Sequence, residues 1–227
     1  MSGGNPRQMA LSHSHLTTLA ALATEHAAAS RVFQKYGLDF CCKGERSIGS
    51  ACAERGLDPN ALLAEIQSSG ASPGAPALGT EALIRFIVTH YHARVREELP
   101  RLSRMAAKVE RVHAEREACP KGLAAHLDHM ADELTTHMNK EEVVLFPLIA
   151  RGGASLHGPV QVMEAEHRDH AENLARLREL ARDFVPPPHA CATWRALYLG
   201  LADFERELME HVHLENHVLF PRALGGE

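Results

Sequence analysis

The chain has 227 residues, of which 45% are hydrophobic, 23% are charged and 5% are aromatic, and its formal net charge is −5. This composition is typical of a globular protein, and the length allows one large domain or two modest ones. The negative charge argues against nucleic acid and anionic membranes as partners. No apolar run approaches the roughly 18 residues that a membrane-spanning helix needs, and the N-terminal residues do not resemble a signal peptide.

The chain contains five cysteines: Cys41, Cys42, Cys52, Cys119 and Cys191. The number is odd and no C-x-x-C pair occurs, which argues against a secreted disulfide framework and against a structural zinc knuckle. We therefore expect a reducing compartment, the cytoplasm, and a structural role for the last three cysteines.

The N-terminal part of the chain predicts a small helical domain over residues 17–67, preceded by a disordered tail over residues 1–16. We expect one helix that ends at Gly37, because glycine is favoured just after a helix C-terminus. A short helix should follow at about residues 48–55. Asp58 and Pro59 are residue types favoured at a helix N-terminus and predict the start of a last helix in this domain.

Residues 68–79 are rich in Ser, Gly, Pro and Ala and predict a linker. Downstream of it, helical patterns occupy about residues 81–112, 122–149, 159–184 and 191–220. Four long helices with short connections predict an antiparallel bundle over residues 80–227, so the expected fold class is all-α.

The second and fourth of these helices end in the same pattern. HMNKEEVVLFP (137–147) aligns with HVHLENHVLFP (211–221) at an offset of 74 residues. Each copy places a histidine four residues before a glutamate: His137 before Glu141, and His211 before Glu215. Residues i and i+4 share one face of a helix, so imidazole and carboxylate can converge on one point.

Each copy is also preceded by a histidine on the helix before it. His92 lies 45 residues before His137, and His167 lies 44 residues before His211. Each half is therefore a helical hairpin, and the two halves direct four imidazoles and two carboxylates into one bundle interior. For any one of these residues the alternative is an exposed position on an amphipathic helix. For the set, carboxylates among apolar neighbours would be costly without a metal ion.

The residue types indicate which metal to expect. Six nitrogen and oxygen ligands exceed what one tetrahedral zinc needs, whereas two bridging carboxylates and two histidines per ion fit a dinuclear site. Imidazole and carboxylate suit iron, with manganese as an alternative. The order and spacing differ from the Glu-x-x-His of ferritin-like bundles, and no H-E-x-x-H metallopeptidase motif occurs.

The ligand pattern resembles that of the hemerythrin-like di-iron bundle. YGLDFCCKG (36–44) resembles the small domain that precedes this bundle in the family of repair-of-iron-centres (YtfE/ScdA-like) proteins. KVERVH (108–113), HMNKEEVVLFP and HLENHVLFPRALGGE strengthen the resemblance, which covers nearly the whole chain from about residue 17.

The resemblance implies two non-haem iron ions joined by an oxo bridge and by the two glutamates. It also implies a role in restoring iron-sulfur clusters damaged by nitrosative or oxidative stress, by donating iron, with nitric oxide chemistry at the same centre. The expected partners are damaged iron-sulfur proteins, with nitric oxide or oxygen as small ligands.

The chain departs from the oxygen-carrying members of the hemerythrin family at two places. They have a further histidine four residues after the third-helix ligand, where this chain has Ala171, with His170 one residue earlier. Their last carboxylate is an aspartate at the position of Asn216, so Glu215 replaces it. Fewer protein ligands would leave open metal positions, which favours chemistry or iron release over carriage.

Further candidates surround this set. Cys41 and Cys42 could act as thiolates toward iron or nitric oxide, the alternative being an inert buried pair. Glu133 and Glu166 are expected to orient ligands or to conduct protons and ions, the alternative being ordinary solvated carboxylates. For His113, a place in a channel or on the surface and ligation of the metal are equally open.

Two other functions stay open. One is a hemerythrin-like sensor or carrier of oxygen or nitric oxide, and the other is a di-iron nitric oxide reductase without a delivery role. A homodimer is expected because the small domain needs a surface to pack against.

Overall fold

The computed structural model describes residues 14–69, 78–152 and 155–225. Their helices are α1 (Leu19–Glu25), α2 (Ala27–Lys35), α3 (Ile48–Arg55), α4 (Pro59–Ser68), α5 (Thr80–Phe86), η1 (Ile87–His92), α6 (Ala93–Val112), α7 (Leu123–Lys140), η2 (Glu141–Leu145), α8 (Phe146–Arg151), α9 (His157–Leu180), η3 (Arg182–Phe184), α10 (Ala192–Leu214), η4 (Glu215–Leu219) and α11 (Phe220–Ala223). The predicted all-α fold class is confirmed. Residues 1–13 of the tail expected at 1–16, and residues 70–77 of the linker expected at 68–79, lie outside the described residues.

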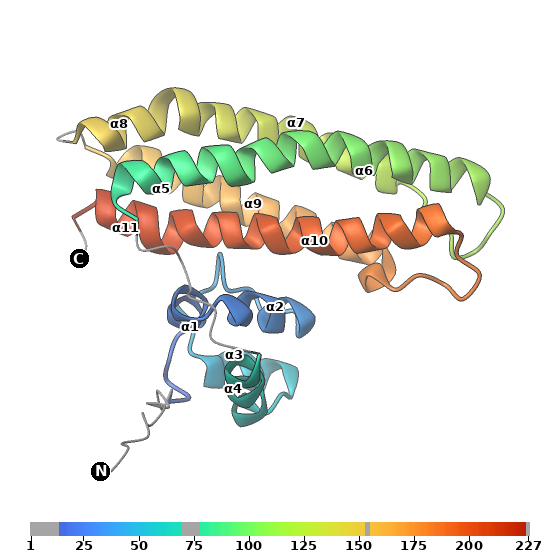
Figure 1. The fold of residues 1–227 in the computed structure, drawn as a ribbon, viewed down its shortest axis with the longest axis horizontal. Coiled ribbons are helices and arrows are strands. Elements are labelled where there is room, and N and C mark those ends of the chain that lie inside the picture. Colours follow the sequence, from blue (N-terminus) through green and yellow to red (C-terminus); the bar gives the residue numbers. More distant parts are fainter. Residues whose placement is uncertain (1–13, 70–77, 153–154, 226–227) are drawn as a thin grey trace, which may run out of the picture.

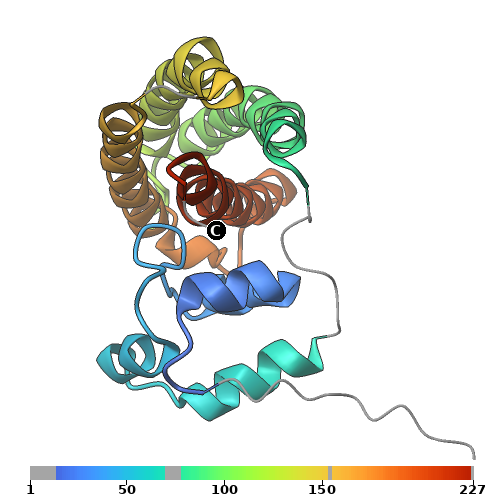
Figure 2. The ribbon, with the colours of Figure 1, turned by 90° about the vertical axis from the view of Figure 1, so that its left-hand side faces the viewer.

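The long helices form a four-helix bundle with a small helical domain against one side (Figure 1). The four rods of the bundle are α5 to α6, α7 to α8, α9, and α10 to α11. Seen along the bundle, they surround one interior, and α1 and α2 lie between the bundle and the pair α3 and α4 (Figure 2). Within the described residues, no helix combines the length and the apolar character that crossing a membrane requires.

The core of the bundle follows from the spacing of its apolar residues. On α7 the buried positions recur at intervals of three and four: Leu127, Met130, Leu134, His137 and then Glu141. On α10 the same intervals give the buried residues Trp194, Leu197, Leu201, Phe204, Leu208, His211 and then Glu215. The histidine and glutamate of each copy therefore continue the apolar stripe that packs the bundle. This register directs both polar side chains into the interior.

Both copies of the repeat also contain a π-helical turn. The turns η2 and η4 begin at Glu141 and at Glu215, and each is followed by a Phe-Pro pair at the start of the next helix. Proline has no N–H to donate, and its ring clashes with the carbonyl four residues earlier, which favours a local change in helical hydrogen bonding, although α6 runs on as an α-helix through Pro100. A single wider turn removes this conflict, and such turns occur often at functional sites.

The small domain differs from the prediction in one respect. A single helix ending at Gly37 was expected, but the segment forms two helices, α1 and α2, which meet at His26. The backbone of His26 is extended, with φ −129° and ψ 110°. The prediction was wrong because helical periodicity in the sequence continues through this residue although its backbone leaves the helical region. After the break, Ser30 Oγ donates to Glu210 at 2.6 Å, and Gln34 donates to the carbonyl of Ala202 at 2.6 Å.

A partly buried ion pair strengthens the contact between the two parts. Arg178 on α9 donates to both carboxylate oxygens of Glu205 on α10, each at 2.6 Å. Gln34 of the small domain also donates to Glu205, at 2.7 Å, and its own carbonyl accepts from Arg178 at 3.3 Å. The small domain thus packs on the bundle of its own chain, which supplies the surface that had suggested a homodimer.

Candidate metal centre

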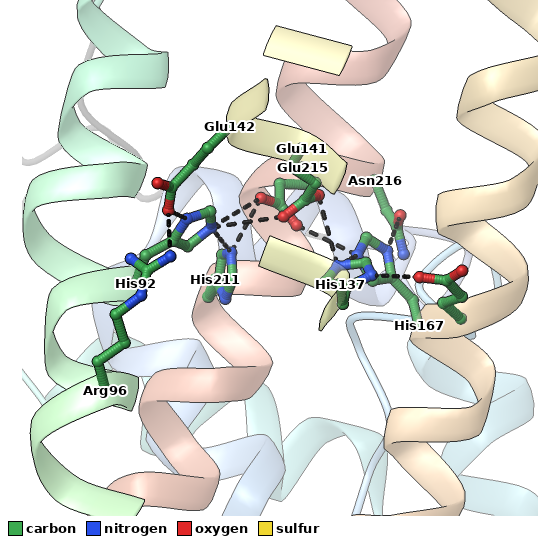
Figure 3. Close-up of polar contacts among 10 residues, drawn as sticks. His92, Arg96, His137, Glu141, Glu142, His167, His211, Glu215 and Asn216 are labelled. Carbon is green, nitrogen blue, oxygen red and sulfur yellow. Dashed lines mark hydrogen bonds and ion pairs between the residues drawn. The ribbon is translucent and has the colours of Figure 1, made fainter. Parts of the chain in front are cut away.

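The six residues that the repeat singles out lie together in the bundle interior (Figure 3). They form two overlapping groups whose possible ligand atoms lie within 4.8 Å of one another. One group is His92, His211, Glu141 and Glu215, and the other is His137, His167, Glu141 and Glu215. All six side chains are at most 1% exposed. Both glutamates belong to both groups, so the arrangement is that of two adjacent positions sharing two carboxylates.

Each glutamate turns one oxygen toward each histidine pair. Glu141 Oε2 lies 3.4 Å from His92 Nε2, and Glu141 Oε1 lies 3.4 Å from His137 Nε2. Glu215 Oε1 lies 2.9 Å from His211 Nε2, and Glu215 Oε2 lies 3.2 Å from His167 Nε2. A carboxylate placed in this way can ligate two ions at once.

The histidine nitrogens also have the spacing of ligands on a common ion. His92 Nε2 and His211 Nε2 are 3.0 Å apart, and His137 Nε2 and His167 Nε2 are 3.1 Å apart. Two donors about 2.1 Å from one ion and at right angles to each other lie about 3.0 Å apart. Each pair therefore matches two neighbouring corners of a coordination shell.

The buried carboxylates support a cation at this site on grounds of free energy. Glu141 is 0% exposed, and neither of its oxygens has a hydrogen-bond partner within the described residues. Glu215 Oε2 likewise has no hydrogen-bond partner among them. Burial disfavours the ionised form of Glu215, but His211 and then His167 hold the pKa of its carboxyl well below the usual range. Ionised oxygens without hydrogen-bond donors in a dry interior are costly unless a cation lies beside them. The residues present therefore fit a bound metal.

Three of the four histidines are held from behind through their second ring nitrogen. His92 Nδ1 lies 2.7 Å from Glu142, which also accepts from Arg96. His137 Nδ1 lies 2.9 Å from Glu166, which also pairs with Lys140. His167 Nδ1 lies 2.7 Å from the amide oxygen of Asn216. Such partners fix the ring and strengthen it as a metal ligand. Neither Glu142 nor Asn216 is preserved in both copies of the repeat, so the sequence predicted no such role for Glu142, and for Asn216 only that it stands where oxygen carriers have an aspartate ligand.

Phenylalanines cover the outer end of the centre. Phe146 stacks on the ring of His92 with a centroid distance of 5.8 Å, and Phe220 stacks on His167 at 6.0 Å. These are the aromatic residues of the two Phe-Pro pairs. The repeat thus supplies the ligands and the apolar cover over them.

A surface pocket of about 330 Å³ adjoins the His137 side of the centre. Its lining comes from α7 and α9 and consists of Asp132, Glu133, Thr136, Lys140, Glu166, Asp169 and His170. Glu133 accepts from Asn173 at 2.6 Å and lies on the pocket wall. The pocket is mostly acidic, so it suits the approach of a cation or of a small neutral ligand.

His170 also lies at this site, although the sequence pattern marked it only as a departure from oxygen carriers. It is 5% exposed, its ring centroid lies 4.8 Å from that of His137, and its buried Nε2 has no hydrogen-bond partner among the described residues. Burial, reinforced by His137 and His167, lowers the pKa of His170 to about 3, so the ring is neutral. Its position three residues after His167, on the buried stripe of α9, was the signal that could have identified it.

The cysteine pair lies against the metal centre. Cys42 Sγ donates to the carbonyl of His167 at 3.3 Å, and the Sγ atoms of Cys41 and Cys42 are 3.7 Å apart. Asp39 and these two thiols form a further group of possible ligand atoms within 4.8 Å. The carbonyl of Cys41 accepts from Asn216 at 3.0 Å, which ties this loop to the turn η4.

His113 lies elsewhere. Its Nε2 is 3.2 Å from Cys191 Sγ, and its ring packs on Trp194 with a centroid distance of 5.1 Å. It does not belong to either group of possible ligands.

Comparison with known proteins agrees with both parts of the chain. The model of the hemerythrin HHE cation binding domain matches residues 83–223, and the ScdA_N model, described as a domain of unknown function, matches residues 15–69. Iron-sulfur cluster repair proteins YtfE of Yersinia pseudotuberculosis serotype IB (strain PB1/+) and of Yersinia pestis (strain Pestoides F) are each 46% identical to this chain over 215 residues. The match covers 92% of this chain and 97% of each relative.

Proposed function

The chain belongs to the family of YtfE iron-sulfur cluster repair proteins with a hemerythrin HHE domain, and from this membership we propose that it repairs damaged iron-sulfur clusters by donating iron. The observation that carries the proposal is the pair of buried glutamates, each of which turns one oxygen toward each histidine pair. This arrangement suits two ions at adjacent positions.

The residues favour iron as the metal. His92 and His211 would hold one ion, His137 and His167 the other, and Glu141 and Glu215 would bridge them. Each ion would then have two imidazole nitrogens and two carboxylate oxygens, a mixed set that suits iron. Iron at this centre would supply an exchangeable metal and a binding place for a small ligand. The oxo bridge that the family resemblance implies belongs to the same proposal.

The cysteine pair has a place in the delivery step. Cys41 and Cys42 lie next to the backbone of His167 and, with Asp39, could receive an ion that leaves the centre. Thiolates bind iron well, and an ion taken up there would displace the thiol protons. The alternative use of the same pair is exchange with a nitrosothiol, which would pass its nitroso group to one of these thiols and take up the thiol proton.

The acidic pocket lies between the surface and the His137 side of the centre, and it offers a route for a ligand or an ion. Glu166 connects the pocket to His137, while Glu133 and His170 lie along its wall. We propose that a cation or a small ligand such as nitric oxide or oxygen uses this route. His113, which contacts Cys191 instead, has no part in it.

We place the protein in the cytoplasm, where its clients would be iron-sulfur proteins damaged by nitrosative or oxidative stress. A homodimer stays a prediction. Reduction of nitric oxide at the same centre is a second candidate function, favoured by the pocket beside the centre and by the small number of protein ligands per ion.

Transfer of iron to a damaged cluster tests the proposal. The iron-loaded protein is incubated under anaerobic conditions with a [4Fe–4S] protein that nitric oxide has inactivated, and a Glu215→Ala variant serves as the ligand-deficient control. We expect recovery of the cluster spectrum together with a matching loss of iron from the donor, and no recovery with the control. Turnover of nitric oxide with no loss of iron would instead support the reductase, and equal recovery with the control would contradict donation.

A further inference from the structure

The two halves of the centre are related by the repeat, and the partners of the histidines can therefore be compared position by position. In the first helix of each half, His92 and His167 correspond at an offset of 75 residues. The residue behind each ring is the one that follows the bridging glutamate: Glu142 behind His92 and Asn216 behind His167. Both are hydrogen-bond acceptors, so the two halves are alike here.

The other two histidines differ. Behind His137 stands Glu166, whose Oε2 lies 2.9 Å from Nδ1 and whose other oxygen pairs with Lys140. The corresponding residues behind His211, at offsets of 75 and 74, are Tyr91 and Leu214. A carboxylate and its lysine in one half are thus replaced by a tyrosine and a leucine in the other.

The structure shows the effect of this replacement on His211. Tyr91 does not offer an acceptor to the ring; it stacks on it, with centroids 5.5 Å apart and an interplanar angle of 8°. Tyr91 and Leu214 belong to one buried apolar cluster. His211 is 1% exposed, and its buried Nδ1 has no hydrogen-bond partner among the described residues.

Each ion position therefore has one histidine backed by a carboxylate, His92 or His137, and the positions differ in the second histidine. His167 donates to an amide oxygen, whereas His211 Nδ1 has no acceptor in the part of the chain that the structure describes. An acceptor behind a ligating imidazole orients the ring and makes it a stronger donor to the metal, and losing one lowers metal affinity by about 10- to 100-fold. The two positions should consequently differ in affinity.

We propose that Tyr91 makes the two metal positions unequal, so that the ion held by His92 and His211 is bound more weakly than the ion held by His137 and His167. The proposal rests on the dinuclear centre of the proposed function. It assigns the exchangeable ion to one position, and it means that one ion can leave while the other keeps both bridging glutamates paired with a cation.

Equilibrium titration of the apo protein with ferrous iron, in competition with a coloured ferrous chelator, tests this inference. The wild type should take up two ions with dissociation constants that differ by about 10- to 100-fold. His211→Ala should remove the weaker step and leave the tighter one, and His137→Ala should leave only a weak step.

Substitution of Tyr91 tests the cause. Tyr91→Glu copies the other half of the repeat and should tighten the weaker step by about tenfold. Tyr91→Phe keeps the stacked ring, adds no acceptor, and should leave both steps unchanged. Glu166→Tyr, the reciprocal change, should weaken the tighter step until the two constants approach each other, and it keeps the test available if Tyr91→Glu does not fold.

Two ions bound with equal constants, or loss of the tighter step in His211→Ala, would overturn the inference and leave the proposed function standing. Uptake of one ion only by the wild type would instead contradict the dinuclear centre itself.

Discussion

Asn216 joins His167, one of the proposed metal ligands, to the small domain. Its amide oxygen lies 2.7 Å from His167 Nδ1, and its amide nitrogen donates to the carbonyl of Cys41 at 3.0 Å. The residue therefore orients a ligand ring and at the same time holds the cysteine loop beside the centre. A shift of the Cys41 carbonyl can therefore alter the hydrogen bond to His167, and the reverse, because both contacts are made by the Asn216 side chain.

We expect Asn216→Ala to lower the affinity for iron by about 10-fold, because His167 loses the acceptor that orients it. Asn216→Asp is the matched control, since its carboxylate keeps an acceptor for His167 but cannot donate to Cys41. Chelator competition should show near-normal iron affinity for Asn216→Asp, while limited proteolysis should cut its cysteine loop faster. Equal iron loss in both variants would mean that the loop contact, and not the ring contact, stabilises the centre.

The ligand assignment makes a simple prediction for metal content. His137→Ala should lose most of the bound iron, because one ion loses an imidazole ligand and is then held less tightly between the buried bridging carboxylates. His157→Ala, an exposed histidine at the start of α9, is the control and should keep the wild-type iron content. Iron content by mass spectrometry decides, and a His137→Ala protein that retains full iron and an unchanged spectrum would rule out this ligand.

Metal binding should strengthen as the pH rises. In the metal-free site, burial lowers the pKa of His137, but Glu141 outweighs this effect and raises the pKa to about 9. Below that pH an incoming ion must displace a proton from the ring, so affinity should grow by up to about tenfold per pH unit between pH 7 and about 9 and then level off. Cobalt(II) is a suitable probe, because its visible spectrum reports binding. An affinity independent of pH over this range would show that the ring is already deprotonated.

The contact between the small domain and the bundle should contribute to stability. Glu205 is 2% exposed, and Glu205→Ala removes the carboxylate that accepts from both Arg178 and Gln34. We expect the free energy of unfolding of the apo protein to fall by about 2 kcal/mol, less than for a fully buried pair because Arg178 is partly exposed. Asp203→Ala on the same helix should change it by no more than about 0.5 kcal/mol, since this carboxylate is largely exposed. Urea unfolding followed by circular dichroism compares the two, and equal effects would argue against a stabilising role for the ion pair.

The bundle and its six ligand candidates could be predicted because they follow from local rules. Intervals of three and four residues place Leu134, His137 and Glu141 on one face, and the same pattern around His211 points to the same interior. Alignment of the two copies then selected the preserved polar residues. The Cys41–Cys42 segment was identified by resemblance, but its contact with His167 depends on packing between distant parts of the chain.

The residues behind the candidate ligands could not be predicted by comparing the two copies, because these residues differ between them. Glu142 and Asn216 serve equivalent rings with different chemistry, so a search for preserved residues passed over both. Tyr91 occupies the position that corresponds to Glu166 in the other copy, and it stacks on His211 where Glu166 contacts His137 through its carboxylate. The break at His26 and the π-helical turns were missed for another reason: the α-helical period assumes an unbroken backbone, whereas packing and proline change it locally.

Iron content with X-ray absorption of anaerobically purified protein tests the central claim most directly. The account predicts two irons per chain, surrounded by nitrogen and oxygen donors and with each iron visible as a neighbour of the other. A single zinc, or a single iron with no metal neighbour, would contradict the shared-carboxylate centre.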